Sequence, residues 1–123
     1  MNRKAKGTRW ENEIIKMLEH DGFKCTRAAG SMGAWDIVGI SSTIVFLIQA
    51  KCNSLPGNKE RLTLSNFECP NDVMKMVWVK RDRMLAPLIY SVLPGGKIKL
   101  DMILSDGWSR DYETMKEARR AKK

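Results

Sequence analysis

Residues 35–52 read WDIVGISSTIVFLIQAKC, and this stretch decides the fold of the chain. Its two apolar runs flank the turn Ser41-Ser42, so the stretch predicts an antiparallel hairpin. Asp36 opens the first run, and Gln49 and Lys51 close the second. Because strand side chains alternate between faces, Gln49 and Lys51 point the same way, and pairing brings both beside Asp36. Such groups are unfavourable in a sheet unless they bind each other, a metal or a substrate, so their convergence indicates a site.

The other elements follow from hydrophobic periodicity and turn residues on either side of this hairpin. Apolar residues at three- and four-residue steps, with Gly22 as a stop, predict a helix over residues 8–21. Strands are then expected at 23–28, 35–40, 43–52, 73–80, 87–93 and 97–104, and a second helix at 59–68. The order helix, three strands, helix, strand predicts an α/β or α+β sandwich in which helices cover a central mixed sheet.

The length and the charge limit the kind of protein. At 123 residues the chain fits one domain, and we expect it over residues 1–104, followed by a basic polar tail over 105–123. Lys and Arg number 22 against 14 Asp and Glu, which gives a formal net charge of +8. This excess suits a polyanionic partner, although charge alone does not separate DNA from RNA or from an acidic membrane.

Several classes of protein are disfavoured. The longest apolar run, Ile44–Ile48, is far shorter than the ~20 residues that a transmembrane helix needs. The basic N-terminus is followed by a mixed polar segment, so we expect no secretory signal, no membrane association and a cytoplasmic location. The three cysteines are widely spaced and lack the pattern of a zinc site, which predicts ordinary thiols.

Each candidate site residue also has a structural interpretation. Glu11 shares the inward face of the first helix, yet Thr8-x-x-Glu11 has the form of a capping box, and both interpretations stay open. Asp36 interrupts an apolar strand, which favours a functional carboxylate over an edge position. Gln49 alone could be a satisfied amide and Lys51 a solvated strand end. Together with Asp36 they form a group that can bind a divalent cation and activate water.

Basic residues gather in two clusters. The first nine residues contain four cations and no acid, namely Arg3, Lys4, Lys6 and Arg9. They could clamp phosphates, or form a solvated tail. A second cluster that could widen the footprint on a polyanion consists of Lys75, Lys80, Arg81 and Arg83.

Motifs along the first 52 residues carry a family resemblance. They are Lys6-Gly7 through Glu11, Gly22-Phe23, Arg27-Ala28-Ala29-Gly30-Ser31, Asp36-Ile37-Val38 and Gln49-Ala50-Lys51. In order and spacing they resemble the archaeal-type Holliday junction resolvases of the PD-(D/E)XK nuclease superfamily. The resemblance implies a restriction-endonuclease-like αβββαβ core.

The resemblance also implies roles for individual residues. It implies that Glu11, Asp36 and the carbonyl oxygen of Ala50 bind the metal. It also implies that Lys51 and Ser31, the latter in the loop before the hairpin, are catalytic residues and that Arg27 contacts phosphate. The implied cofactor is Mg²⁺, for which Mn²⁺ can substitute.

Gln49 is the one departure from the family pattern, which normally has Glu at this position. A neutral amide still offers an oxygen to a metal but lowers the negative charge of the site, so ion affinity should be weaker. Gln-x-Lys also occurs among relatives in the superfamily, so we keep Gln49 in the predicted metal set.

These expectations combine into a Mg²⁺-dependent endonuclease that resolves four-way junctions in branched double-stranded DNA as a homodimer. A related restriction or repair nuclease is the nearest alternative, and a non-catalytic nucleic-acid-binding module with the same fold is another. We hypothesise that part of a methionine-rich apolar region forms the dimer interface, although its residues could equally belong to the core. The region comprises Met74, Met76, Trp78, Met84, Leu85, Leu88 and Tyr90.

Overall fold

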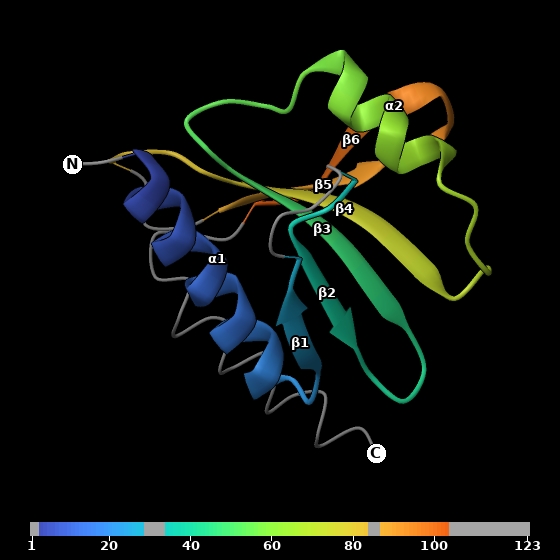
Figure 1. Ribbon diagram of the computed structural model, residues 1–123, viewed down its shortest axis with the longest axis horizontal. Coiled ribbons are helices and arrows are strands. Elements are labelled where there is room, and N and C mark those ends of the chain that lie inside the picture. Colours follow the sequence, from blue (N-terminus) through green and yellow to red (C-terminus); the bar gives the residue numbers. More distant parts are fainter. Residues whose placement is uncertain (1–2, 29–33, 84–86, 104–123) are drawn as a thin grey trace.

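The structure is a computed structural model that describes residues 3–28, 34–83 and 87–103. Within them, one six-stranded sheet runs in chain order from β1 to β6, and α1 and α2 pack on opposite sides of it (Figure 1). The elements are α1 (Arg3–His20), β1 (Lys24–Arg27), β2 (Ile37–Ile40), β3 (Val45–Cys52), α2 (Asn58–Asn66), β4 (Val73–Lys80), β5 (Leu88–Val92), the 3-10 turn η1 (Pro94–Gly96) and β6 (Ile98–Ile103). Neighbouring strands are antiparallel except β3 and β4, which are parallel. The predicted α/β class with a mixed sheet is confirmed.

The first helix differs most from the prediction, because it begins at Arg3 rather than Thr8. An N-cap residue has a non-helical backbone, whereas Thr8 lies inside α1, so the capping-box interpretation of Glu11 is wrong. The preceding segment is rich in Lys, Arg and Ala, which are strong helix formers.

The end of α1 follows the prediction. Gly22 has a φ of 91°, a left-handed conformation that glycine adopts without strain. The Gly22 amide donates to the Glu19 carbonyl at 3.1 Å, and the Phe23 amide donates to the Leu18 carbonyl at 3.0 Å. These two bonds form a Schellman motif, which satisfies helix carbonyls and turns the chain into β1.

The hairpin of β2 and β3 is confirmed. Ile37 pairs with Ile48 and Ile40 with Val45, in antiparallel register. The connection is closed by Ser41, whose Oγ accepts the Ile44 amide at 3.0 Å.

The core lies mainly between α1 and one face of the sheet. Ile37 and Ile48 project from β2 and β3 into this layer and are fully buried. The buried members from the helix and the strand that follows are Trp10, Ile14, Met17, Leu18 and Phe23. On the other face, Leu64 of α2 is fully buried. Gln49 is buried on this side of the sheet, under α2, although it is polar.

The hypothesis of a methionine-rich dimer interface changes with the structure. Met76 and Trp78, offered as part of a dimer interface, are buried in the layer under α1, so for these two the core interpretation is correct. Met84 and Leu85 lie outside the described residues, as does the predicted tail over 105–123. Among the described helices, neither combines the length and the apolarity that crossing a membrane requires.

Candidate active site

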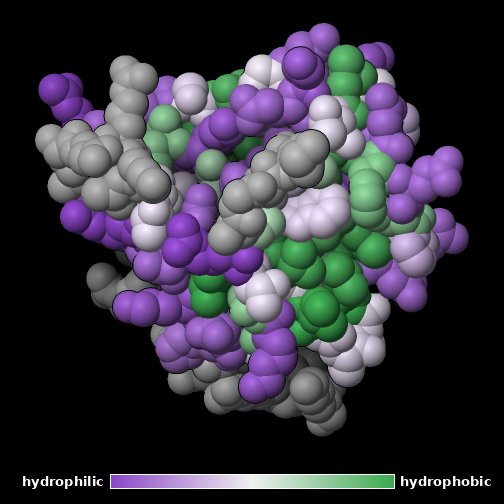
Figure 2. Space-filling model, viewed as in Figure 1, coloured by the Kyte–Doolittle hydropathy of each residue, from purple (hydrophilic) through white to green (hydrophobic). Residues whose placement is uncertain are grey.

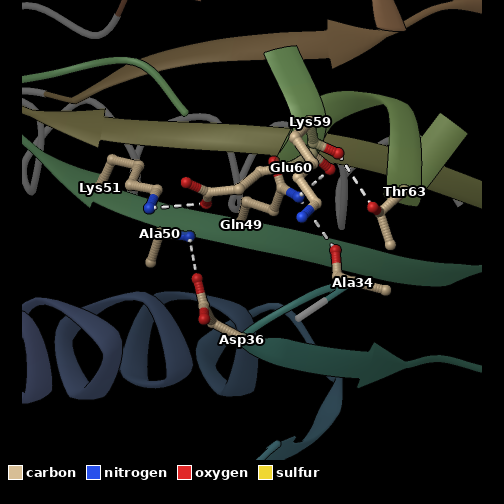
Figure 3. Close-up of polar contacts among 8 residues, drawn as sticks. All are labelled: Ala34, Asp36, Gln49, Ala50, Lys51, Lys59, Glu60 and Thr63. Atoms are coloured by element: carbon tan, nitrogen blue, oxygen red, sulfur yellow. Dashed lines mark hydrogen bonds and ion pairs between the residues drawn. The ribbon is translucent and has the colours of Figure 1, made fainter. Parts of the chain in front are cut away.

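Asp36 lies at the start of β2, where β1, β2 and β3 meet. Its backbone is fixed on both sides: the Asp36 amide donates to the Ile48 carbonyl at 2.8 Å, and its carbonyl accepts the Ala28 amide at 2.8 Å. The side chain turns toward β3, and its Oδ2 accepts the Ala50 amide at 2.8 Å (Figure 3). The predicted convergence of Asp36 with the end of β3 is therefore present in the structure.

The Asp36 carboxyl is held in a partly desolvated position. Burial raises the pKa of this carboxyl, and the negative charge of Glu60 adds to the rise. The Ala50 amide and the Lys51 ammonium favour the ionised form but do not cancel the effect of burial. A cation beside Asp36 would stabilise its charged form, which is the behaviour expected of a metal ligand.

Gln49 is buried, with 2% of its surface exposed, and it works as a double donor. Its Nε2 donates to the Ala34 carbonyl and to the Glu60 carbonyl, both at 3.0 Å. Two carbonyl partners require the NH₂ group at this place, which fixes the orientation of the amide. Oε1 has no hydrogen-bond partner among the described residues. A buried oxygen without a partner is unfavourable unless it receives a ligand.

Lys51 points to the same side as Gln49, as the strand alternation predicted. Its Nζ lies 2.7 Å from Oε2 of Glu60, in the first turn of α2 (Figure 3). The sequence reasoning missed Glu60. A signal was available, because ligand sites in sheets with parallel strands cluster beyond the carboxyl ends of those strands. An acid in the first turn of the helix that follows β3 belongs to that region.

Glu11 lies on the sheet side of α1, next to the same group of strand ends. Its carboxylate forms an ion pair with Nε of Arg27 at 2.9 Å. Arg27 pairs with Ile37 in the register of β1 and β2, one residue from Asp36. In the described part of the chain, Glu11 is connected to Asp36 through Arg27 and this strand pairing rather than by direct contact.

The comparisons with known proteins agree with this geometry. A family model described as archaeal Holliday junction resolvase (hjc) matches residues 2–85. The chain belongs to this family. The match includes every predicted site residue and extends through β4, beyond the 52 residues that carried the resemblance.

A solved structure supports the family assignment. The chain is similar to Hjc from Archaeoglobus fulgidus, described as a Holliday junction resolvase from an archaeal hyperthermophile, with 28% identity and a TM-score of 0.60. The similarity covers 71% of this chain and 73% of that chain. No protein among the curated sequences matches this one. Family and structure together identify the chain as a nuclease of the Holliday junction resolvase type with an α/β fold.

The structure describes only some of the remaining predicted site residues. Ser31 lies outside the described residues, and for Arg3, Lys4 and Lys6 only the helical backbone is described. Arg9 is exposed on α1, where it is available to a phosphate.

Two members of the second basic cluster have structural partners. Lys75 donates to the Ser65 carbonyl at 3.0 Å and to the Phe67 carbonyl at 2.5 Å, so it caps the end of α2. Lys80 pairs with Glu13 at 2.9 Å and lies over the Trp10 ring. These contacts do not support a DNA contact for either lysine.

The residues around Asp36 and the end of β3 offer mostly oxygen atoms as ligands, the type that Mg²⁺ prefers. Among the described residues, no three His, Cys, Asp or Glu side chains lie close enough together to hold a metal ion by themselves. A metal at this place would therefore use the Asp36 carboxylate together with amide or carbonyl oxygens. The unpartnered Oε1 of Gln49 fits that role. Ala50 fits it too, because the N–H and C=O of one strand residue point to the same side, and its N–H points at Asp36.

Proposed function

We propose that this protein is a Mg²⁺-dependent endonuclease that cuts two opposed strands of a four-way DNA junction, with residues 1–104 as its nuclease domain. The observation that carries the proposal is the meeting of Asp36, Gln49 and Lys51 at the end of β3, in a member of the archaeal Holliday junction resolvase family. A cytoplasmic location and branched DNA as the partner belong to the same proposal.

The residues at the end of β3 have distinct roles. Asp36, Oε1 of Gln49 and the Ala50 carbonyl would hold Mg²⁺, with Glu11 as a further carboxylate on α1. When bound there, Mg²⁺ neutralises charge on the scissile phosphate and lowers the pKa of water. Lys51, partly exposed at the strand end, orients the attacking water and offsets charge on the phosphate.

Cations around this group would bind the DNA backbone. In the part of the chain that the structure describes, Arg27 pairs with Glu11 through its Nε alone, which leaves its terminal nitrogens for a phosphate. Arg9 on the same helix is exposed, and Arg3, Lys4 and Lys6 extend α1 with positive charge. Ser31 is proposed to join the site from its loop. These contacts fix the position of the backbone and do not read bases.

The proposal is tested with labelled DNA. Purified protein in Mg²⁺ is expected to produce two symmetric nicks in a four-way junction and to leave a linear duplex of equal length uncut. Binding of the junction without cutting in either Mg²⁺ or Mn²⁺ would establish the non-catalytic module instead. Equal cutting of junction and duplex would establish a related nuclease with a different DNA target.

We propose a homodimer, because two active sites related by a two-fold axis can cut two opposed strands. The hydrophobic surface that supports it lies over β2 and β3, on the face away from α1 (Figure 2). Ile40 is 51% exposed there, and Val45 pairs with it from β3. A hydrophobic patch of this kind on a small protein is typical of an interaction surface.

Ile40→Glu is expected to convert the dimer into a monomer, because a charge at the centre of an apolar interface loses its hydration without gaining a partner. Sedimentation at working concentration measures the change. Leu100→Glu is the matched control, since Leu100 is 42% exposed on β6 at the opposite edge of the sheet. A wild-type monomer, or an Ile40→Glu variant that stays dimeric, would contradict this interface.

A further inference from the structure

The predicted site is short of negative charge. Asp36 and Lys51 carry opposite charges and Gln49 is neutral, so the three together have no net charge. The Glu11 carboxylate is already paired with Arg27. Divalent cations bind where carboxylates outnumber cationic side chains, so a metal at this place needs a further carboxylate near Asp36.

The surroundings of Gln49 require hydrogen-bond donors, which a glutamate at this position would lack. Both N–H groups of its amide are used, one toward the Ala34 carbonyl and one toward the Glu60 carbonyl. A carboxylate at this position has no proton to donate and would face two carbonyl oxygens in a buried place. The surroundings of residue 49 therefore select an amide, and the missing carboxylate has to come from another segment.

Glu60, in the first turn of α2, is placed to supply the further carboxylate. Its backbone carbonyl is bound by Gln49, and its carboxylate reaches Lys51 at 2.7 Å (Figure 3). Glu60 pairs with Lys51 and Asp36 accepts the amide of Ala50, so the two carboxylates bind adjacent residues of β3. Oε1 of the buried Gln49, which has no hydrogen-bond partner in the described part of the chain, belongs to the same group and adds an oxygen that can bind a metal.

We propose that Glu60 is the second carboxylate of the metal site, and that Gln49 is the positioning residue whose two hydrogen bonds hold the first turn of α2 against the end of β3. This inference rests on the proposed function, since it adds a ligand to the same site. In the structure, the Lys51 ammonium pairs with the Glu60 carboxylate at 2.7 Å. Glu60 of α2 thus supplies the negative charge that the neutral Gln49 of β3 does not bring to the site.

Titration of the full-length protein with Mn²⁺, without DNA, tests the role of Glu60 by calorimetry. Glu60→Gln is expected to weaken Mn²⁺ binding by at least about 10-fold, because loss of even an outer-shell partner of a metal typically costs about 10- to 100-fold. Glu60 is exposed in the described structure, so the variant should keep its melting temperature. The control is Glu68→Gln, which makes the same charge change just beyond α2 and should bind Mn²⁺ like the wild type.

Gln49→Glu separates positioning from charge. The variant adds a negative charge but loses both donated hydrogen bonds, and we expect weaker Mn²⁺ binding and slower junction cutting. If Gln49 were only a neutralised ligand, the same change would strengthen both. The result for Glu60→Gln decides the inference if Gln49→Glu does not fold.

The outcomes distinguish this inference from the proposed function. Wild type that binds Mn²⁺ and cuts junctions, together with a Glu60→Gln variant that does both equally well, overturns the role of Glu60 and leaves the function standing. Wild type that neither binds Mn²⁺ nor cuts overturns both.

Discussion

Replacing Asp36 with alanine is expected to abolish junction cutting while junction binding persists. The Asp36 carboxylate is fixed by the Ala50 amide at 2.8 Å in a partly buried place, so alanine removes a proposed metal ligand that the backbone holds in position. Loss of one hydrogen-bond donor that stabilises a transition state lowers a rate by about 10²- to 10³-fold, and loss of a metal ligand should reach at least this size. DNA affinity depends mainly on cations that contact phosphates, so it should change little.

The cutting rate under single-turnover conditions measures the effect of Asp36→Ala, and a gel-shift titration measures binding. Asp72→Ala is a matched control, because Asp72 is an exposed acid at the opposite end of β3, where its backbone carbonyl accepts the Val45 amide. Cutting by Asp36→Ala at the wild-type rate would remove the proposed active site.

Replacing Lys51 with methionine is expected to lower the cutting rate by roughly 10²- to 10⁴-fold, the range for loss of an acid–base group. Methionine keeps most of the length of the side chain but removes the ammonium that lies 2.7 Å from Glu60. Because a positive charge leaves the site, Mn²⁺ binding should persist or become tighter. This opposite response of cutting and metal binding is not expected if Lys51 only holds α2 in place.

The same two assays measure the response of Lys51→Met, with Lys24→Met as control. Lys24 is exposed on β1 and pairs with Ile40, away from the site. An undiminished rate in Lys51→Met would mean that Lys51 takes no part in the reaction.

The sequence was sufficient for those features that depend on short-range pattern. The hairpin of β2 and β3 joins adjacent segments, so alternation and one turn fixed its register and placed Asp36 beside the end of β3. The bounds of β4 agree fully, because six of the eight residues from Val73 to Lys80 are Val, Met or Trp. The stop at Gly22 followed from its tolerance of a left-handed backbone.

The features that the sequence did not show depend on contacts between distant segments. The start of α1 is unmarked by a clear N-cap, and Thr8-x-x-Glu11 imitates one inside the helix. The NH₂ group of Gln49 donates to the carbonyls of Ala34 and Glu60, which come from two other segments. The role of Glu60 needs the return of the chain through α2 to the end of β3, and local pattern does not specify that placement.

A crystal structure of the protein with Mn²⁺, located by its anomalous scattering, tests the central claim most directly. The account predicts one ion beside Asp36, with Oε1 of Gln49 and the Glu60 carboxylate among its ligands and Lys51 released from Glu60. An ion bound elsewhere, with Lys51 still paired to Glu60 and Asp36 free of metal, would contradict it.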